Sequence, residues 1–304
     1  MALEQLKSDQ RISDRVDEIS RDLILRLSGK DTTVDKKIID NIFSFMSLSG
    51  GAGASTLLAN VASRLSSKGL QVVVVDLNIA FPVQQLFFGS VQKIDTSDLV
   101  SVIMGDATLG AALEDKGGVY LLYSHNRLTY DKIVTDSAIA GKSFSSMLEN
   151  LSSLFDVVLI DIPTRGDLEY EIANTALYES DFVYCIMDEN TSCISSYNRI
   201  LSNFSYMGIS TATVKLIMNK RTNIVYPAAV FSSIEKYPDV ILPYDISIVD
   251  TGLRGGIYVK SGKGQSKTSR QFVMGIDDLT NLVLDCGGYN RDSSQIVANN
   301  TVNA

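Results

Sequence analysis

Residues 48–60 read LSGGAGASTLLAN, and this stretch determines the fold that the sequence predicts. Before it, residues 37–49 form a short apolar run, KIIDNIFSFMSLS, which is typical of a buried strand in a parallel sheet. After it, residues 55–70 repeat apolar side chains at helical spacing and stop at Gly69. Residues 71–78, QVVVVDLN, are a second buried strand. Strand, glycine-rich turn, helix and strand make a βαβ unit with a right-handed crossover.

The same alternation continues along the chain. Four more apolar runs predict buried strands at residues 118–125, 155–163, 181–189 and 213–221. The length and the spacing of apolar residues predict helices at residues 141–154, 192–208 and 269–286. Residues 239–260 are expected to form a long loop. The predicted fold is therefore α/β, a doubly wound and mostly parallel sheet whose ligands bind at the carboxyl ends of the strands.

Three parts of the chain differ in pattern. Residues 1–40 contain an amphipathic helix and a linker, residues 41–286 form the α/β domain, and residues 287–304 are a polar tail that is expected to be disordered. The fold thus carries an N-terminal helical extension. Two interpretations of this helix stay open: it packs on the main domain, or it docks a partner or a second copy of the chain.

Composition excludes several classes of function. The chain has 304 residues, of which 45% are hydrophobic, and a net charge of -8, which disfavours binding to nucleic acid or anionic lipid. Its three cysteines have no zinc or redox spacing, as expected in a reducing cytoplasm. No apolar stretch reaches the roughly 18 residues of a membrane span. We expect a cytoplasmic protein, with peripheral association at the inner face of a membrane complex left open.

The glycine-rich turn has the layout of a phosphate-binding loop. Glycines at 50, 51 and 53, with Ala52 between them, let backbone N–H groups curve around phosphate oxygens at the start of the following helix. Ser55 stands where a hydroxyl binds Mg²⁺, and Thr56 is placed to donate to the α-phosphate of ATP or ADP.

The loop lacks its usual lysine, because Ala54 stands at that position. Two unit charges about 4 Å apart interact by roughly 4 kcal/mol at an effective dielectric near 20, before desolvation is subtracted. Without this charge the loop is expected to bind a nucleotide but to stabilise poorly the charge that develops during hydrolysis. Asp76 and Asp161 end two apolar runs, and Asp161 suits a carboxylate that orders Mg²⁺ through water.

These motifs resemble the MinD/ParA superfamily of deviant Walker-A P-loop ATPases, and within it the TadZ/CpaE branch of pilus assembly proteins. The superfamily loop KGGxGK[ST]T is similar to SGGAGAST here, with Ser49 in place of the signature lysine and Ala54 in place of the P-loop lysine. A small residue at the second variable position of the pattern GGxGxST, which is Ala54 here, is typical of the TadZ/CpaE branch. The signature lysine normally reaches a partner's phosphates across a homodimer, which Ser49 cannot do.

The resemblance also implies roles for other residues. VVVVDLNIAFP is similar to the switch I block, so Asp76 and Asn78 correspond to its two catalytic carboxylates, with an amide in place of the second. Asp161 and Ser55 are then the Mg²⁺ ligands. LIMNK implies that Asn219 reads the adenine edge, and LPYD that Pro243 and Asp245 frame the base.

The function implied is a homodimeric, nucleotide-binding scaffold that localises parts of a Tad (Flp) pilus or a related secretion apparatus, with weak or absent ATP hydrolysis. The alternative is an active ParA/MinD-type ATPase that positions DNA or a membrane-associated complex. Residues 260–270 form a basic loop, which is either a solvated surface or an anion or partner contact that replaces the missing lysines in part.

Overall fold

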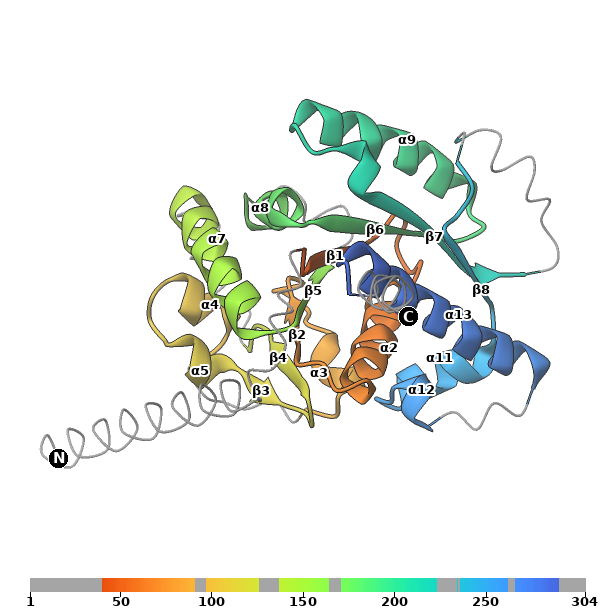
Figure 1. Cartoon of the computed structure of the whole chain (residues 1–304), viewed down its shortest axis with the longest axis horizontal. Helices are drawn as coiled ribbons and strands as arrows, with labels where there is room; N and C mark the ends of the chain where they lie inside the picture. Colours follow the sequence, from red (N-terminus) through yellow and green to blue (C-terminus); the bar gives the residue numbers. More distant parts are fainter. Residues whose placement is uncertain are drawn as a thin grey trace, which may run out of the picture.

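The computed structural model describes residues 40–90, 97–125, 137–163, 171–222, 234, 236–261 and 266–289. Their centre is an eight-stranded sheet with the order β3-β4-β2-β5-β1-β6-β7-β8 (Figure 1). The strands are β1 Ile42–Ser47, β2 Val72–Asp76, β3 Glu114–Asp115, β4 Val119–Leu122, β5 Val157–Ile162, β6 Phe182–Met187, β7 Val214–Arg221 and β8 Val240–Pro243.

The strands pair in parallel except at one edge, where β3 is antiparallel to β4. From β1 the chain runs outward to β2 and β4, returns to β5, and then continues on the other side of β1 through β6, β7 and β8. The connections therefore change direction beside β1. In such sheets the ligand crevice lies at the carboxyl end of the strands at this switch point.

Helices cover both faces of the sheet (Figure 1). One face carries α4 Leu99–Ile103, α5 Leu109–Ala112, α7 Ser137–Leu154, α8 Glu171–Glu179 and α9 Thr191–Tyr206. The other carries α2 Ala54–Ser67, α11 Ile246–Leu253, α12 Tyr258–Ser261 and α13 Lys267–Cys286. Successive residues of β2 enter opposite cores, Val73 on the first face and Val72 on the second. The predicted doubly wound α/β fold is confirmed.

The expectation of a long loop at residues 239–260 is wrong. This stretch contains β8, α11 and α12. β8 forms because it pairs in parallel with β7, and α11 begins because the Asp245 side chain accepts a hydrogen bond from Ser247 N at 2.9 Å. The expected helix within residues 1–40 and most of the expected polar tail lie outside the described residues, so these boundaries stay predictions.

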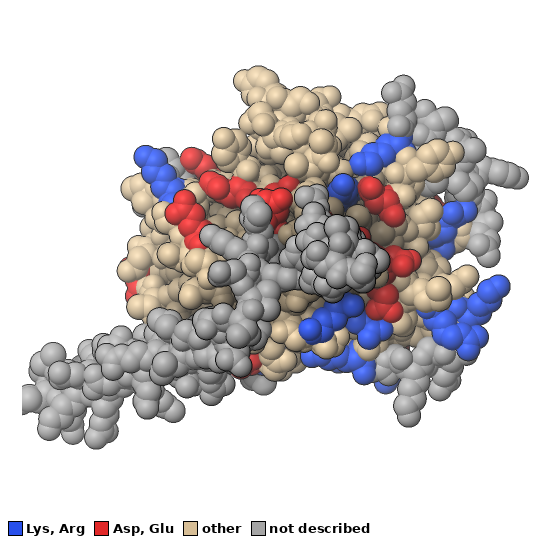
Figure 2. Space-filling model, in the orientation of Figure 1, with Lys and Arg blue, Asp and Glu red and all other residues tan. Residues whose placement is uncertain are grey.

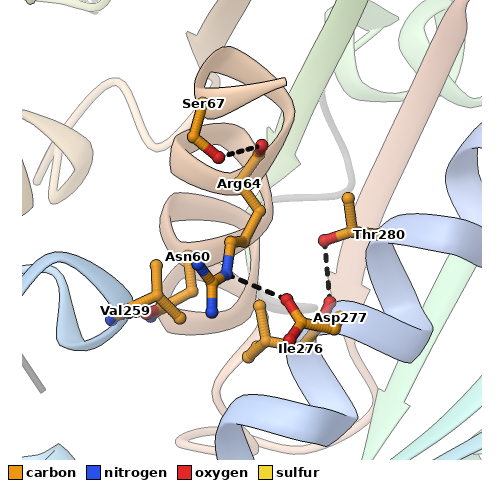
Figure 3. A network of polar contacts seen from close by, with 7 residues as sticks. All are labelled: Asn60, Arg64, Ser67, Val259, Ile276, Asp277 and Thr280. Atoms are coloured by element: carbon orange, nitrogen blue, oxygen red, sulfur yellow. Dashed lines mark hydrogen bonds and ion pairs between the residues drawn. The ribbon is translucent and has the colours of Figure 1, made fainter. Parts of the chain in front are cut away.

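The helix that follows the glycine-rich loop is tied to the C-terminal helices by polar contacts (Figure 3). Asn60 on α2 is buried; its Oδ1 accepts from Val259 N at 3.0 Å, and its Nδ2 donates to Thr56 O at 2.8 Å. One turn later, Arg64 Nε lies 2.9 Å from Asp277 Oδ1 on α13. These contacts fix the helix at whose start a ligand is expected to bind.

Replacing Asn60 tests this attachment. Asn60→Leu keeps the branched shape but leaves the half-buried Val259 N–H without its acceptor, so we expect the free energy of unfolding in urea to fall by about 1–3 kcal/mol. Ser67→Ala removes an exposed hydroxyl from the same helix and is expected to cost less than about 0.5 kcal/mol. Equal stability of the two variants would contradict the structural role of Asn60.

Candidate functional site

The loop between β1 and α2 is shaped by its glycines. Gly51 and Gly53 have φ angles of 81° and 102°, in the left-handed region that favours glycine. A Cβ added to Gly53 would lie 2.5 Å from Asn219 Nδ2. Any side chain at residue 53 would therefore displace the Asn219 amide from the loop.

Side chains from β1 and β7 hold the loop. Ala54 N donates to Ser47 Oγ at 3.2 Å, and Asn219 Nδ2 donates to the Ala52 carbonyl at 2.8 Å. Lys220 Nζ donates to the Gly51 carbonyl. Two successive carbonyls of the loop are thus bound by two successive residues of β7.

A cavity of about 280 Å³ opens where the loop meets β7, β8 and α11. Five residues that the sequence motifs predicted line this cavity: Gly53, Thr56, Asn219, Pro243 and Asp245. Most of the remaining wall is apolar and comes from α3 Gln84–Phe87, α11 and α13, with side chains of Phe87, Ile248, Val249, Leu253 and Phe272. A narrow apolar cavity with few polar groups suits a planar aromatic ring.

Asp245 lies in the cavity wall but is mainly a structural residue. Its Oδ1 accepts from Ser247 N, and its Oδ2 accepts from Ser269 Oγ at 2.8 Å and from Ser266 Oγ at 3.1 Å. Burial acts to raise its pKa, but these hydrogen bonds outweigh burial and lower the pKa below its ordinary value. Asp245 therefore joins the start of α11 to the start of α13 as a carboxylate.

Asp76 and Asp161 are direct neighbours in the sheet, at the ends of β2 and β5. Both are buried. Asp76 accepts from the backbone N–H groups of Asn78, Val83 and Gln84 at 2.7–2.9 Å, which fixes the chain between β2 and α3. Asp161 Oδ2 accepts from Gln84 Nε2 at 2.6 Å.

Burial dominates the titration of this pair. It raises the pKa of Asp76 to about 6, against the lowering effect of three backbone hydrogen bonds. Burial, and then the charge of Asp76, raise the pKa of Asp161 to about 8, against hydrogen bonds from Gln84 and the Ser55 side chain. Two adjacent buried carboxylates favour a shared proton unless a cation neutralises them.

The donor set near Asp161 fits Mg²⁺. The Ser55 side chain hydrogen-bonds to Asp161, and Gln84 Oε1 is buried without a hydrogen-bond partner in the described part of the chain. Within that part, no group of three or more His, Cys, Asp or Glu residues could hold a metal. Mg²⁺ is commonly held by one or two carboxylates together with water and substrate phosphates, so this oxygen-rich corner beside the loop suffices.

The other predicted positions lie beside this corner or the cavity. Gly50 and Ala54 belong to the loop and its helix start, and Asn78 is half-buried two residues after the end of β2. Ser49 Oγ accepts a hydrogen bond from Cys193 Sγ at 3.1 Å. The expected basic loop at residues 260–270 is wrong at both ends, because Lys260 belongs to α12 and residues 267–270 begin α13. Lys260 lies 5.9 Å from the Phe88 ring, in a separate hollow with Lys116, and does not line the cavity. Their roles at a nucleotide stay predictions.

Sequence reasoning missed three kinds of site residue. The apolar wall from α11 had a signal, since Ile246, Val249 and Leu253 recur at helical spacing within the segment assigned to a loop. Gln84 had none, because its partner Asp161 is 77 positions away. Lys220 follows Asn219 directly in the sequence. Its contact with the loop depends on its left-handed backbone, for which the sequence has no signal.

Neutralising Asp161 should change the pH dependence of stability. A carboxyl whose pKa rises from 3.8 to about 8 on folding takes up a proton, so the free energy of unfolding falls as pH rises through this interval. In nucleotide- and metal-free protein, Asp161→Asn is expected to raise stability at pH 8 by on the order of 1–3 kcal/mol and to change it little at pH 4. Thermal unfolding between pH 4 and 9 measures this.

The exposed Asp278 provides the control, since Asp278→Asn should follow the wild-type pH profile. A profile for Asp161→Asn that also follows the wild type would show that Asp161 titrates normally.

Known proteins share both sequence and fold with this chain. MinD, the septum site-determining protein of Escherichia coli K12, is 30% identical over 154 residues, which are 50% of this chain and 54% of that protein. The chain therefore spans about half the length of the curated relatives it matches. MinD of Pyrococcus horikoshii OT3, solved with Mg-ADP, aligns with a TM-score of 0.67 at 21% identity, over 82% of this chain and 99% of that one.

A ParA family ATPase from Chlorobium tepidum TLS aligns with a TM-score of 0.66 at 18% identity, over 79% of this chain and 98% of that one. At these identities the structural likeness establishes the fold. A family model for an AAA domain matches residues 40–208, more than half of the sequence. The chain belongs to this AAA domain family and has the fold of MinD and ParA ATPases.

Proposed function

We propose that this protein binds an adenine nucleotide with Mg²⁺ at the loop of residues 49–56 and uses it as a conformational ligand, with weak or absent hydrolysis. One observation carries the proposal: Gly53, which has a left-handed backbone, lies against Asn219, and both residues line an apolar cavity. The loop proposed to bind phosphates and the cavity proposed to bind the adenine ring are therefore adjacent. A relative supports the ligand, since P. horikoshii MinD was solved with Mg-ADP.

The base is assigned to the cavity. Asn219 Nδ2 is engaged by the Ala52 carbonyl, so Asn219 Oδ1 is the atom that accepts from the exocyclic amine of adenine. Phe87 and Ile248 supply apolar contact, and Pro243 limits the width of the slot. Thr56 lies at the junction of the cavity with the start of α2, where the α-phosphate is expected.

Mg²⁺ is assigned to Ser55 and Asp161, where it would supply the positive charge for the β- and γ-phosphates. Chain residues that would speed hydrolysis are missing or occupied. Ala54 and Ser49 carry no charge, and Asn78 is a poor base. Asp76 already accepts three backbone hydrogen bonds. Weak turnover follows from these four positions.

The biological role that we propose is that of a TadZ/CpaE-like scaffold of a Tad pilus or related secretion apparatus, acting as a homodimer. Large apolar side chains are exposed near the cavity: Phe81, Leu86, Ile246 and Leu253 have exposed fractions of 56–83%. α3 and α11 lie side by side, since a Cβ on Gly252 would lie 3.4 Å from the Phe87 ring. A nucleotide that contacts both helices would alter this surface and so control protein contacts.

The alternative, an active ATPase that positions DNA or a membrane-associated complex, is favoured by the intact Ser55 and Asp161 pair. The charge is unfavourable for DNA: the net charge is -8, and acidic and basic groups lie close together on the face seen in Figure 2. No described helix is long and apolar enough to cross a membrane. The rate of ATP hydrolysis distinguishes the scaffold from the active ATPase.

Calorimetric titration with ATP or ADP and Mg²⁺ tests the proposed function. Wild type should bind, and Gly53→Ala should weaken binding at least about tenfold, because its Cβ displaces Asn219 from the loop. Thr56→Val, which leaves the backbone unstrained, should weaken binding as well. Ser153→Ala on the distant α7 should bind as wild type does.

Steady-state turnover is measured with the same proteins. We expect a rate on the order of 10⁻³ s⁻¹ or less, in the range of P-loop proteins that lack a catalytic cation. Faster hydrolysis that is abolished by Asp161→Ala would select the active ATPase instead. Absence of binding by the wild type would refute both.

A further inference from the structure

We infer that Lys220, at the end of β7, supplies the positive charge that the phosphate loop lacks and is the residue that distinguishes nucleoside polyphosphates from nucleosides. This inference rests on the proposed function. It assigns a phosphate-binding role to a lysine that lies outside the loop, 166 positions after the alanine at the usual place.

The backbone at Lys220 is unusual. Lys220 has a φ of 57° and is the only non-glycine residue with positive φ among those the structure describes. It lies where the pairing of β7 with β8 shifts register, between Met218 and Arg221. A bulge with a left-handed lysine is unfavourable by itself, and such conformations concentrate at functional sites, where they redirect a side chain.

The bulge directs the side chain toward the loop. Lys220 Nζ donates to the Gly51 carbonyl, and Lys220 Cε lies 3.8 Å from a Cβ position on Gly53. With regular strand geometry the side chains of Asn219 and Lys220 would point to opposite faces of the sheet. Here both reach the loop, so the irregularity has a geometric consequence.

The ammonium group is also able to leave the carbonyl. A carbonyl oxygen is a neutral acceptor, whereas a phosphate oxygen carries charge and makes the stronger hydrogen bond with an ammonium group. The four-carbon stem of lysine lets Nζ exchange one acceptor for the other without a change in the backbone. Lys220 therefore holds the loop in shape before a ligand enters and contacts the phosphates afterwards.

Other cations near the site are engaged elsewhere. Arg221 Nε lies 3.7 Å from Glu189 Oε1, Arg64 pairs with Asp277, and Lys260 faces the Phe88 ring. Among the described residues that line the cavity, Lys220 alone is cationic. Within the described part of this wall, no second positive charge can replace it.

The test compares ligands that differ in phosphate number. Binding of adenosine, ADP and ATP, the nucleotides with Mg²⁺, is measured by calorimetry for wild type and Lys220→Met. We expect the variant to lose about tenfold or more in affinity for ADP and ATP and less than about twofold for adenosine. Lys215→Met, which removes a lysine at the opposite end of the same strand, should leave all three affinities unchanged.

Three further variants separate charge from structure. Lys220→Arg keeps the charge and should bind ATP within about threefold of wild type. Lys220→Asn tolerates the left-handed backbone and removes the charge, so its affinity for ATP should fall as that of Lys220→Met does. The double variant Lys220→Met, Ala54→Lys returns a lysine to the loop and should recover most of the lost ATP affinity.

Each other outcome counts against the inference. Equal losses for adenosine and ATP, or recovery of ATP affinity by Lys220→Asn, would make Lys220 a structural residue only. Unchanged ATP binding by Lys220→Met would remove it from the site while leaving the proposed function intact. Wild-type protein that binds none of the three ligands would refute the proposed function and this inference together.

Discussion

The approach of Gly53 to Asn219 is the contact on which the rest of the site depends. The loop leaves β1, follows β6 through the hydrogen bond from Leu48 N to the Ile186 carbonyl at 2.8 Å, and then reaches β7 two strands away. With no Cβ at Gly53, Asn219 can donate to the Ala52 carbonyl. The loop and the cavity are therefore formed by one contact, and a change in either is transmitted to the other.

Charge at the site is arranged in two opposed groups. The helix start and the glycine-rich loop present partial positive charge from main-chain N–H groups, and β2 and β5 end in two buried carboxylates. Gln84 joins them, because its Nε2 donates both to Asp161 and to the Ser55 carbonyl. A nucleotide and its metal ion would complete the balance of charge, which supports the proposed binding without the loop lysines.

Much of the fold was predictable, because the buried parallel strands are short, continuous apolar runs that are rich in β-branched and aromatic residues. β8 was not predictable: its four residues form a strand only through pairing with β7. The loop was recognisable from its glycines, but the cavity wall was not, since it combines α3, α11 and α13 from distant parts of the sequence. The contacts of Lys220 and Gln84 could not be predicted from the sequence, because a bulge and a buried amide produce no periodic pattern of residues.

The last helix of the domain has a consequence for how the protein is made. α13 packs on α2 and on β8, and its Phe272, Ile276 and Leu279 are buried in the same core as Leu57 and Leu58 of α2. Gly275 permits this approach, since a Cβ there would lie 3.0 Å from Leu242 Cγ. While the ribosome has yet to release residues 267–286, the part of α2 that contacts α13 stays uncovered. The strands of the sheet cover another part of this face earlier, so completion of the α2 and α13 layer, rather than formation of the sheet, waits for the end of translation of the domain.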